Sequence, residues 1–159
     1  MHKATAVLFA GLSVVSVCAS AAPKEPATPN PGIACGEAIA RNPDFAPING
    51  KIFLGNPANQ PSDMLNISDK ATDAEKPVIS AWLSARQACF RQSVAWVQQQ
   101  GGPKEYLSLL GDINAAAIAR TEDLLAGRLT YGGYAKARHD LVERAKIETE
   151  RLQRYLRAQ

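Results

Sequence analysis

The sequence has few of the residues that carry catalysis or bind metals. Among 159 residues it contains two histidines, His2 and His139, and three cysteines, Cys18, Cys35 and Cys89. The cysteines and histidines lack the CxxC and HxxxH spacings of metal sites, no serine sits in a nucleophile elbow, and no Gly-rich loop suits a phosphate. The sequence therefore predicts no catalytic residues, no metal and no cofactor.

The sequence also lacks a large excess of one charge, and it has few long hydrophobic runs. The one long apolar run, residues 4–17 at the N-terminus, is shorter than the about 20 residues that a membrane span needs. No transmembrane helix is therefore predicted. Lys and Arg outnumber Asp and Glu by 18 to 15. This balance argues against a nucleic-acid binder, although the cations concentrate in the last fifth of the chain.

The N-terminal run has the layout of a signal peptide. Lys3 gives a positive start, residues 4–17 are uncharged and apolar, and Ala19-Ser20-Ala21 is a small-x-small cleavage site. We expect residues 1–21 to be removed and the protein to be periplasmic or secreted in a bacterium. A lipid anchor at Cys18 is the minority alternative, because Val17 occupies a lipobox position that usually holds Gly, Ala or Ser.

Cys35 and Cys89 remain after the predicted cleavage. In an exported chain, an even number of cysteines indicates a disulfide. The bridge would close a loop of roughly 54 residues, which corresponds to about 4 kcal/mol in the chain-entropy model.

The remaining chain is predicted to be a flexible leader, residues 22–33, and one helical domain, residues 34–159. Residues 35–41 suit one or two helical turns, and residues 44–69 suit an irregular connection with a short helix near residues 62–66. Several apolar side chains of this connection should fold over the core: Phe45, Ile48, Ile52, Phe53, Leu54 and Leu65.

Three long helices follow. The first starts at a Thr72/Glu75 capping box and runs to Gln100, the second spans residues 103–126, and the third spans residues 131–157 behind a Thr130 cap. Because the connections are short, we expect an all-α, up-down-up bundle with the N-terminal segment tied on by the disulfide.

Apolar residues recur at helical spacing on these helices. Trp82, Cys89 and Trp96 form one row of the first helix, and Leu83, Phe90 and Val97 form a second row beside it. The second helix carries Leu107, Leu110, Ala117, Ile118, Leu124 and Leu125, and the third has a stripe that includes Tyr131, Tyr134 and Tyr155. We predict core packing for these rows, with a two-tryptophan ligand platform as the alternative.

The turn between the second and third predicted helices has a distinctive sequence. The residues from Leu125 to Tyr134 read LAGRLTYGGY. They resemble a corner of exported helical proteins of proteobacteria, where a leucine, a glycine, a basic residue, Ile or Leu and Thr-Tyr-Gly are followed by an acidic or polar residue and an aromatic. Gly133 occupies the acidic position, so we expect a looser corner. The resemblance covers the last third of the chain and implies an exported helical fold, with no activity or site to transfer.

The predicted function is that of an exported, non-catalytic envelope protein, which binds an unknown protein or an anionic envelope polymer. The third helix supplies the candidate partner-binding residues, Lys136, Arg138, Arg144, Arg151, Arg154 and Arg157. The competing interpretation is a solvated helix face. Two other functions stay open: an inhibitor of a secreted hydrolase such as lysozyme, and a small hydrolase that uses His139 or the carboxylates Glu105, Asp112, Glu122 and Asp123.

Overall fold

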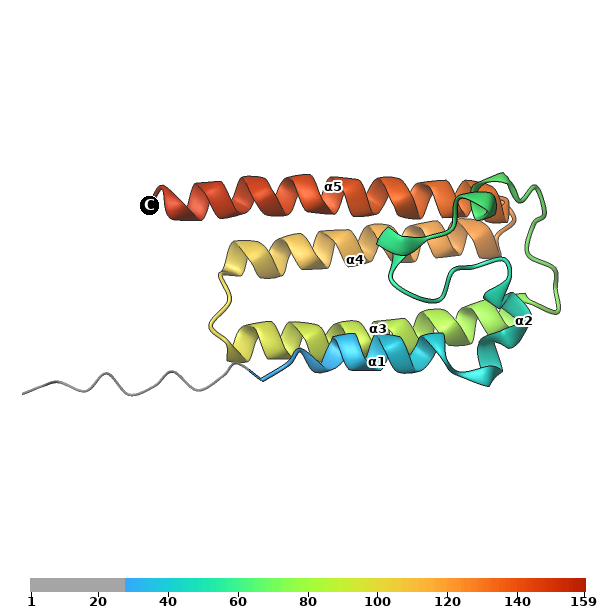
Figure 1. The fold of residues 1–159 in the computed structure, drawn as a ribbon, viewed down its shortest axis with the longest axis horizontal. Coiled ribbons are helices and arrows are strands. Elements are labelled where there is room, and N and C mark those ends of the chain that lie inside the picture. Colours follow the sequence, from blue (N-terminus) through green and yellow to red (C-terminus); the bar gives the residue numbers. More distant parts are fainter. Residues whose placement is uncertain (1–27) are drawn as a thin grey trace, which may run out of the picture.

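A computed structural model describes residues 28–159 of the chain. The predicted signal peptide, Cys18 and most of the predicted leader lie outside the described residues. The described part is all-α (Figure 1), which confirms the predicted fold class. No helix within residues 28–159 has both the length and the apolar character needed to cross a membrane.

The bundle consists of α3 (Lys76–Gln99), α4 (Lys104–Leu125) and α5 (Tyr131–Arg157), each antiparallel to the next (Figure 1). Gly101 and Gly127 end α3 and α4 with φ of 72° and 69°. These values lie in the left-handed region that favours glycine at helix ends. The first helix was predicted to start near Thr72, but residues 73–75 form a turn and Lys76 is the first helical residue.

A shorter helix, α1 (Pro31–Ala40), packs along α3 and is joined to it by the Cys35–Cys89 disulfide, as predicted. The predicted boundary between leader and domain, after residue 33, is wrong because α1 already starts at Pro31. Asn30 caps this start by accepting a hydrogen bond from the Gly32 N–H at 2.9 Å, and proline is well suited to the first helical position.

Short helical turns cover one end of the bundle: η1 (Pro43–Phe45), α2 (Ala46–Asn49), η2 (Pro57–Asn59) and η3 (Ser62–Asn66). The predicted short helix at residues 62–66 is confirmed as a 3-10 helix. Of the connection's apolar side chains, four are buried (Phe45, Ile48, Ile52 and Leu54) and two are partly buried (Phe53 and Leu65). The connection therefore closes the core, as expected from its apolar residues.

The core lies mainly at this covered end. The most fully buried large side chains come from α2 and the segment after it, the first turns of α3, the last turns of α4 and the first turn of α5: Trp82, Tyr131, Ile48, Ile52, Ile79 and Leu124. At the opposite end α5 projects past α4 (Figure 1). Tyr155 is 57% exposed there, so its predicted place on the packed stripe is wrong.

Candidate functional site

A pocket of about 310 Å³ lies between α1, α3, α4 and α5. This volume is at the lower end of the range of ligand pockets, about 300–1,000 Å³. Most of its wall is apolar, with Leu83 and Phe90 from α3 and Leu110, Ile113 and Ile118 from α4. Its polar side chains are Arg86, Gln87, Ser93, Asn114, Thr121, Tyr134 and Arg138.

This pocket occupies a place where the sequence predicted packed core. Leu83 and Phe90 belong to the second apolar row of α3, and Leu110 and Ile118 belong to the apolar side of α4. All four are only partly buried, and all four line the pocket. Small residues on the same walls, such as Gly36, leave part of the space between the helices unfilled.

Arg138 is buried at this pocket and is only 6% exposed, so its predicted place on an exposed basic surface is wrong. Its Nη1 donates a hydrogen bond to the Phe53 carbonyl at 2.8 Å, and its guanidinium lies 5.5 Å from the centre of the Trp82 ring. Its buried Nη2 has no hydrogen-bond partner among the described residues. A sequence signal existed: Arg138 follows Tyr134 by four residues, so both share the inner face of α5.

Arg86 places a second guanidinium 5.2 Å from the centre of the same Trp82 ring. Burial lowers the pKa of Arg86, and burial together with the charge of Arg86 lowers the pKa of Arg138 to about 10. Arg138 therefore remains cationic at neutral pH, as arginine side chains generally do in proteins. No acidic residue lines the pocket within residues 28–159, and none of the ion pairs formed in that range includes either arginine.

The two tryptophans do not form a ligand platform. Trp82 is 1% exposed and stacks beneath the two arginines, as expected of a core residue. Trp96 donates its Nε1 hydrogen bond to the Thr28 carbonyl at 2.9 Å. Neither residue lines the pocket.

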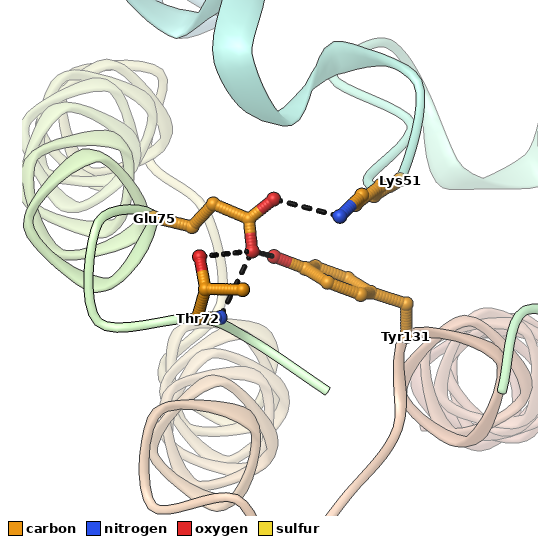
Figure 2. A network of polar contacts seen from close by, with 4 residues as sticks. All are labelled: Lys51, Thr72, Glu75 and Tyr131. Carbon is orange, nitrogen blue, oxygen red and sulfur yellow. Dashed lines mark hydrogen bonds and ion pairs between the residues drawn. The ribbon is translucent and has the colours of Figure 1, made fainter. Parts of the chain in front are cut away.

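A polar network centred on Glu75 joins three segments of the chain (Figure 2). The Glu75 carboxylate accepts hydrogen bonds from Lys51 Nζ at 2.8 Å, from Thr72 N and Oγ1 at 2.9 Å each, and from Tyr131 OH at 3.0 Å. Lys51 follows α2, Thr72 and Glu75 precede α3, and Tyr131 begins α5 (Figure 2). The bond from the Thr72 N–H to the Glu75 carboxylate is one half of the predicted capping box. The other half differs, because the Thr72 hydroxyl donates to the Glu75 carboxylate and does not accept from the Glu75 N–H.

The network is suited to holding the fold and not to proton transfer. Burial alone raises the pKa of Glu75, but the hydrogen bonds from Lys51, Thr72 and Tyr131 outweigh it and lower that pKa to about 2. Burial and the contact with Glu75 raise the pKa of Tyr131 above its ordinary value. A general base or acid needs a pKa near the working pH, and both shifts move away from neutrality.

The corner before α5 is fixed by backbone contacts. Thr130 caps α5 by accepting from the Gly133 N–H at 3.0 Å, as predicted. The N–H groups of Tyr131 and Gly132 donate to the carbonyls of Asp69 and Ile67, each at 2.8 Å. These two bonds tie the corner to the segment before α3.

The chain matches no family model, no curated protein and no solved structure.

The other predicted partner-binding residues are exposed on α5: Lys136, Arg144, Arg151, Arg154 and Arg157. Along most of the helix they alternate with the carboxylates Asp140, Glu143, Glu148 and Glu150. Arg151 pairs with Glu148 at 3.0 Å. Only the end of α5, the segment Arg151–Arg157, contains cations and no acidic residue.

The carboxylates of the hydrolase alternative are not gathered in one site. Glu105 and Asp112 line an open groove between the start of α4 and the end of α5. Asp112 and Glu122 are about 15 Å apart along α4 at the helical rise. Asp123 pairs with Arg120 at 3.0 Å and Arg128 at 2.7 Å, and His139 is exposed. The described residues contain no group of three or more His, Cys, Asp or Glu placed to hold a metal ion.

Proposed function

We propose that the protein is an exported, non-catalytic binding protein, periplasmic or secreted, which engages an acidic protein partner with the end of α5. The observation that carries this proposal is the segment Arg151–Arg157 at the end of α5, where the helix runs past the start of α4 (Figure 1). It contains three arginines and an exposed tyrosine. With 27 residues against 22, α5 is longer than α4 by about 7.5 Å at the helical rise. The disulfide is consistent with an oxidising compartment outside the cytoplasm.

The chemistry of this segment favours a protein partner over an anionic polymer. Tyr155 is 57% exposed and lies beside the partly buried Leu152 and Leu156. Arginine and tyrosine are enriched in protein interfaces, where they supply charge together with apolar contact area. An anionic polymer needs the cations alone and leaves the apolar side chains without a role.

The test is capture of a partner from an envelope extract, followed by cross-linking to α5. Reversal of the three arginines in Arg151→Glu, Arg154→Glu and Arg157→Glu should abolish capture. The matched control reverses three exposed cations elsewhere on the helix, Lys136→Glu, Arg144→Glu and Lys146→Glu, and should retain it.

Two results would contradict the proposal. Equal loss of capture in both triple variants would indicate a response to net charge and not to this segment. Binding of the protein to purified anionic polysaccharide, with no protein captured, would indicate that the partner is a polymer. The hydrolase-inhibitor alternative is tested with the same variants, because inhibition of lysozyme would have to depend on the same segment.

A further inference from the structure

We propose that the pocket between α1, α3, α4 and α5 binds a small amphiphilic anion, with a carboxylate or phosphate head against Arg86 and Arg138 and a short apolar tail along the α3 and α4 walls. This site is separate from the end of α5. It therefore does not depend on the proposed function.

The charge of the pocket favours an anion. Two guanidiniums lie 5.2 and 5.5 Å from one tryptophan ring, and no carboxylate among the described residues lines the pocket. Buried charges in proteins are normally paired, because a cation removed from water without a counter-charge costs several kcal/mol. Stacking on Trp82 offsets part of this cost, since a cation over an aromatic face gains about 0.5–2 kcal/mol. A bound anion would supply the missing counter-charge.

The hydrogen-bonding groups point to an oxyanion. Arg138 uses Nη1 on the Phe53 carbonyl and retains a buried Nη2 without an acceptor. A buried donor without a partner costs about 1–3 kcal/mol, so the Nη2 atom lowers the stability of the fold unless it gains an acceptor. Guanidinium groups match the geometry of carboxylates and phosphates, which can accept two N–H bonds at once. Because Nη2 is enclosed, a small shift of the Arg138 side chain would accompany binding.

The apolar wall excludes a bare inorganic ion as the best ligand. Five large apolar side chains line the pocket: Leu83, Phe90, Leu110, Ile113 and Ile118. Covering them gains about 25 cal/mol for each Å² of apolar surface removed from water. A volume of about 310 Å³ suits a short tail and not a diacyl lipid. The ligand class is therefore a single short chain with one anionic head.

The experiment is isothermal titration calorimetry of the oxidised mature chain with decanoate and decyl phosphate, below the concentrations at which they form micelles. Decanol and decyltrimethylammonium are the uncharged and oppositely charged controls with the same chain. We expect at least one of the two anions to bind at least about tenfold more tightly than decanol, the effect of one charge-assisted hydrogen bond. Comparison of the two anions tells a carboxylate ligand from a phosphate ligand.

The variants locate the site. Arg86→Met keeps the length and apolar stem of the side chain and should weaken binding at least about tenfold. Arg91→Met, an exposed arginine on the same helix, should leave binding unchanged. The charge reversal at the end of α5 should also leave it unchanged, which separates this site from the proposed partner surface.

Arg138→Met removes a buried contact and can unfold the chain. The second variant is therefore Ile113→Trp, whose larger side chain fills the pocket. This variant should abolish binding of the anion. The proposal is overturned if neither anion binds more tightly than decanol, or if Arg86→Met and Ile113→Trp, both folded, bind as the wild type does.

Discussion

Gly132 lies where the first turn of α5 meets the backbone of residues 65–67. A Cβ atom at this position would be 2.6 Å from the Leu65 carbonyl oxygen and 2.7 Å from the Ile67 carbonyl oxygen. Both obstacles are backbone atoms, so they cannot rotate away. We expect Gly132→Ala to lower the free energy of unfolding by about 1–3 kcal/mol, as other overpacking substitutions do. Urea denaturation followed by circular dichroism measures the loss.

Gly111 provides the control for this substitution. It lies exposed in the interior of α4, and a Cβ atom there would meet nothing within 4 Å. Gly111→Ala should therefore stabilise the protein by about 0.5–1 kcal/mol, because alanine loses less backbone entropy in a helix. Similar changes in the two variants would show that the contacts with Leu65 and Ile67 do not constrain position 132.

Glu75 gives the protein an acid-sensitive stability. Its pKa in the folded state is lowered from 4.5 to about 2. A carboxyl whose pKa is lower in the folded state stabilises the fold above its unfolded pKa, and this contribution is lost as the pH falls through the folded pKa. We therefore expect wild-type stability to decrease between pH 4.5 and about 2 more steeply than that of Glu75→Gln. Denaturant titrations at several pH values measure this difference in slope.

Asp73 is the neighbouring control for the acid response. Its pKa is also lowered, by the hydrogen bond and charge of Lys76, but the carboxylate is fully exposed to solvent. Exposed ion pairs contribute little to stability. Asp73→Asn should follow the wild-type pH profile, and a flattened profile would assign the acid response to this pair and not to the Glu75 network.

At the scale of elements, α1 depends on its bond to α3. The Cys35–Cys89 disulfide spans 54 residues, and the chain-entropy model assigns such a bridge about 4 kcal/mol. The double variant Cys35→Ala and Cys89→Ala should lose stability of this order, with a lower thermal midpoint. A reductant should lower the midpoint of the wild type and leave that of the variant unchanged. An equal effect of reductant on both proteins would contradict a role for this bond.

The long helices could be predicted because local signals determine their ends. Thr130 caps α5, and Gly101 and Gly127 have the positive φ that ends a helix. The sequence does not predict the start of α1, because the proline-rich stretch that precedes Pro31-Gly32 favours a flexible leader. Asn30, which caps α1, was the available signal.

The pocket could not be predicted from the apolar rows. Periodicity identifies residues that share one face of a helix, such as Leu83 and Phe90, but it does not determine whether that face meets the facing row. The distance between the two rows depends on how the ends of α3 and α4 are held and on the small residues between the helices. Arg138 was missed for a different reason: arginine was assigned to the surface by its type, although its spacing from Tyr134 places it inside.

At the scale of the whole molecule, stability is distributed unevenly along the bundle. The fully buried side chains gather where α2, the start of α3, the end of α4 and the start of α5 meet. At the other end α4 contributes no fully buried side chain, and α5 projects past it (Figure 1). Local opening has a low free energy where few apolar contacts hold a segment. One continuous helix, α5, therefore joins a strongly held half to a weakly held one.

Amide hydrogen exchange along α5 tests this distribution. The amides of residues 134–142 should exchange only on global unfolding, because Tyr134, Ala135 and Arg138 are buried against the core. Those from residue 151 onward should exchange by local fraying, since exposed residues dominate that end. Gly132→Ala should reduce protection in the first group and leave the second unchanged, because fraying does not depend on the core. Uniform protection along the whole helix would contradict an uneven distribution.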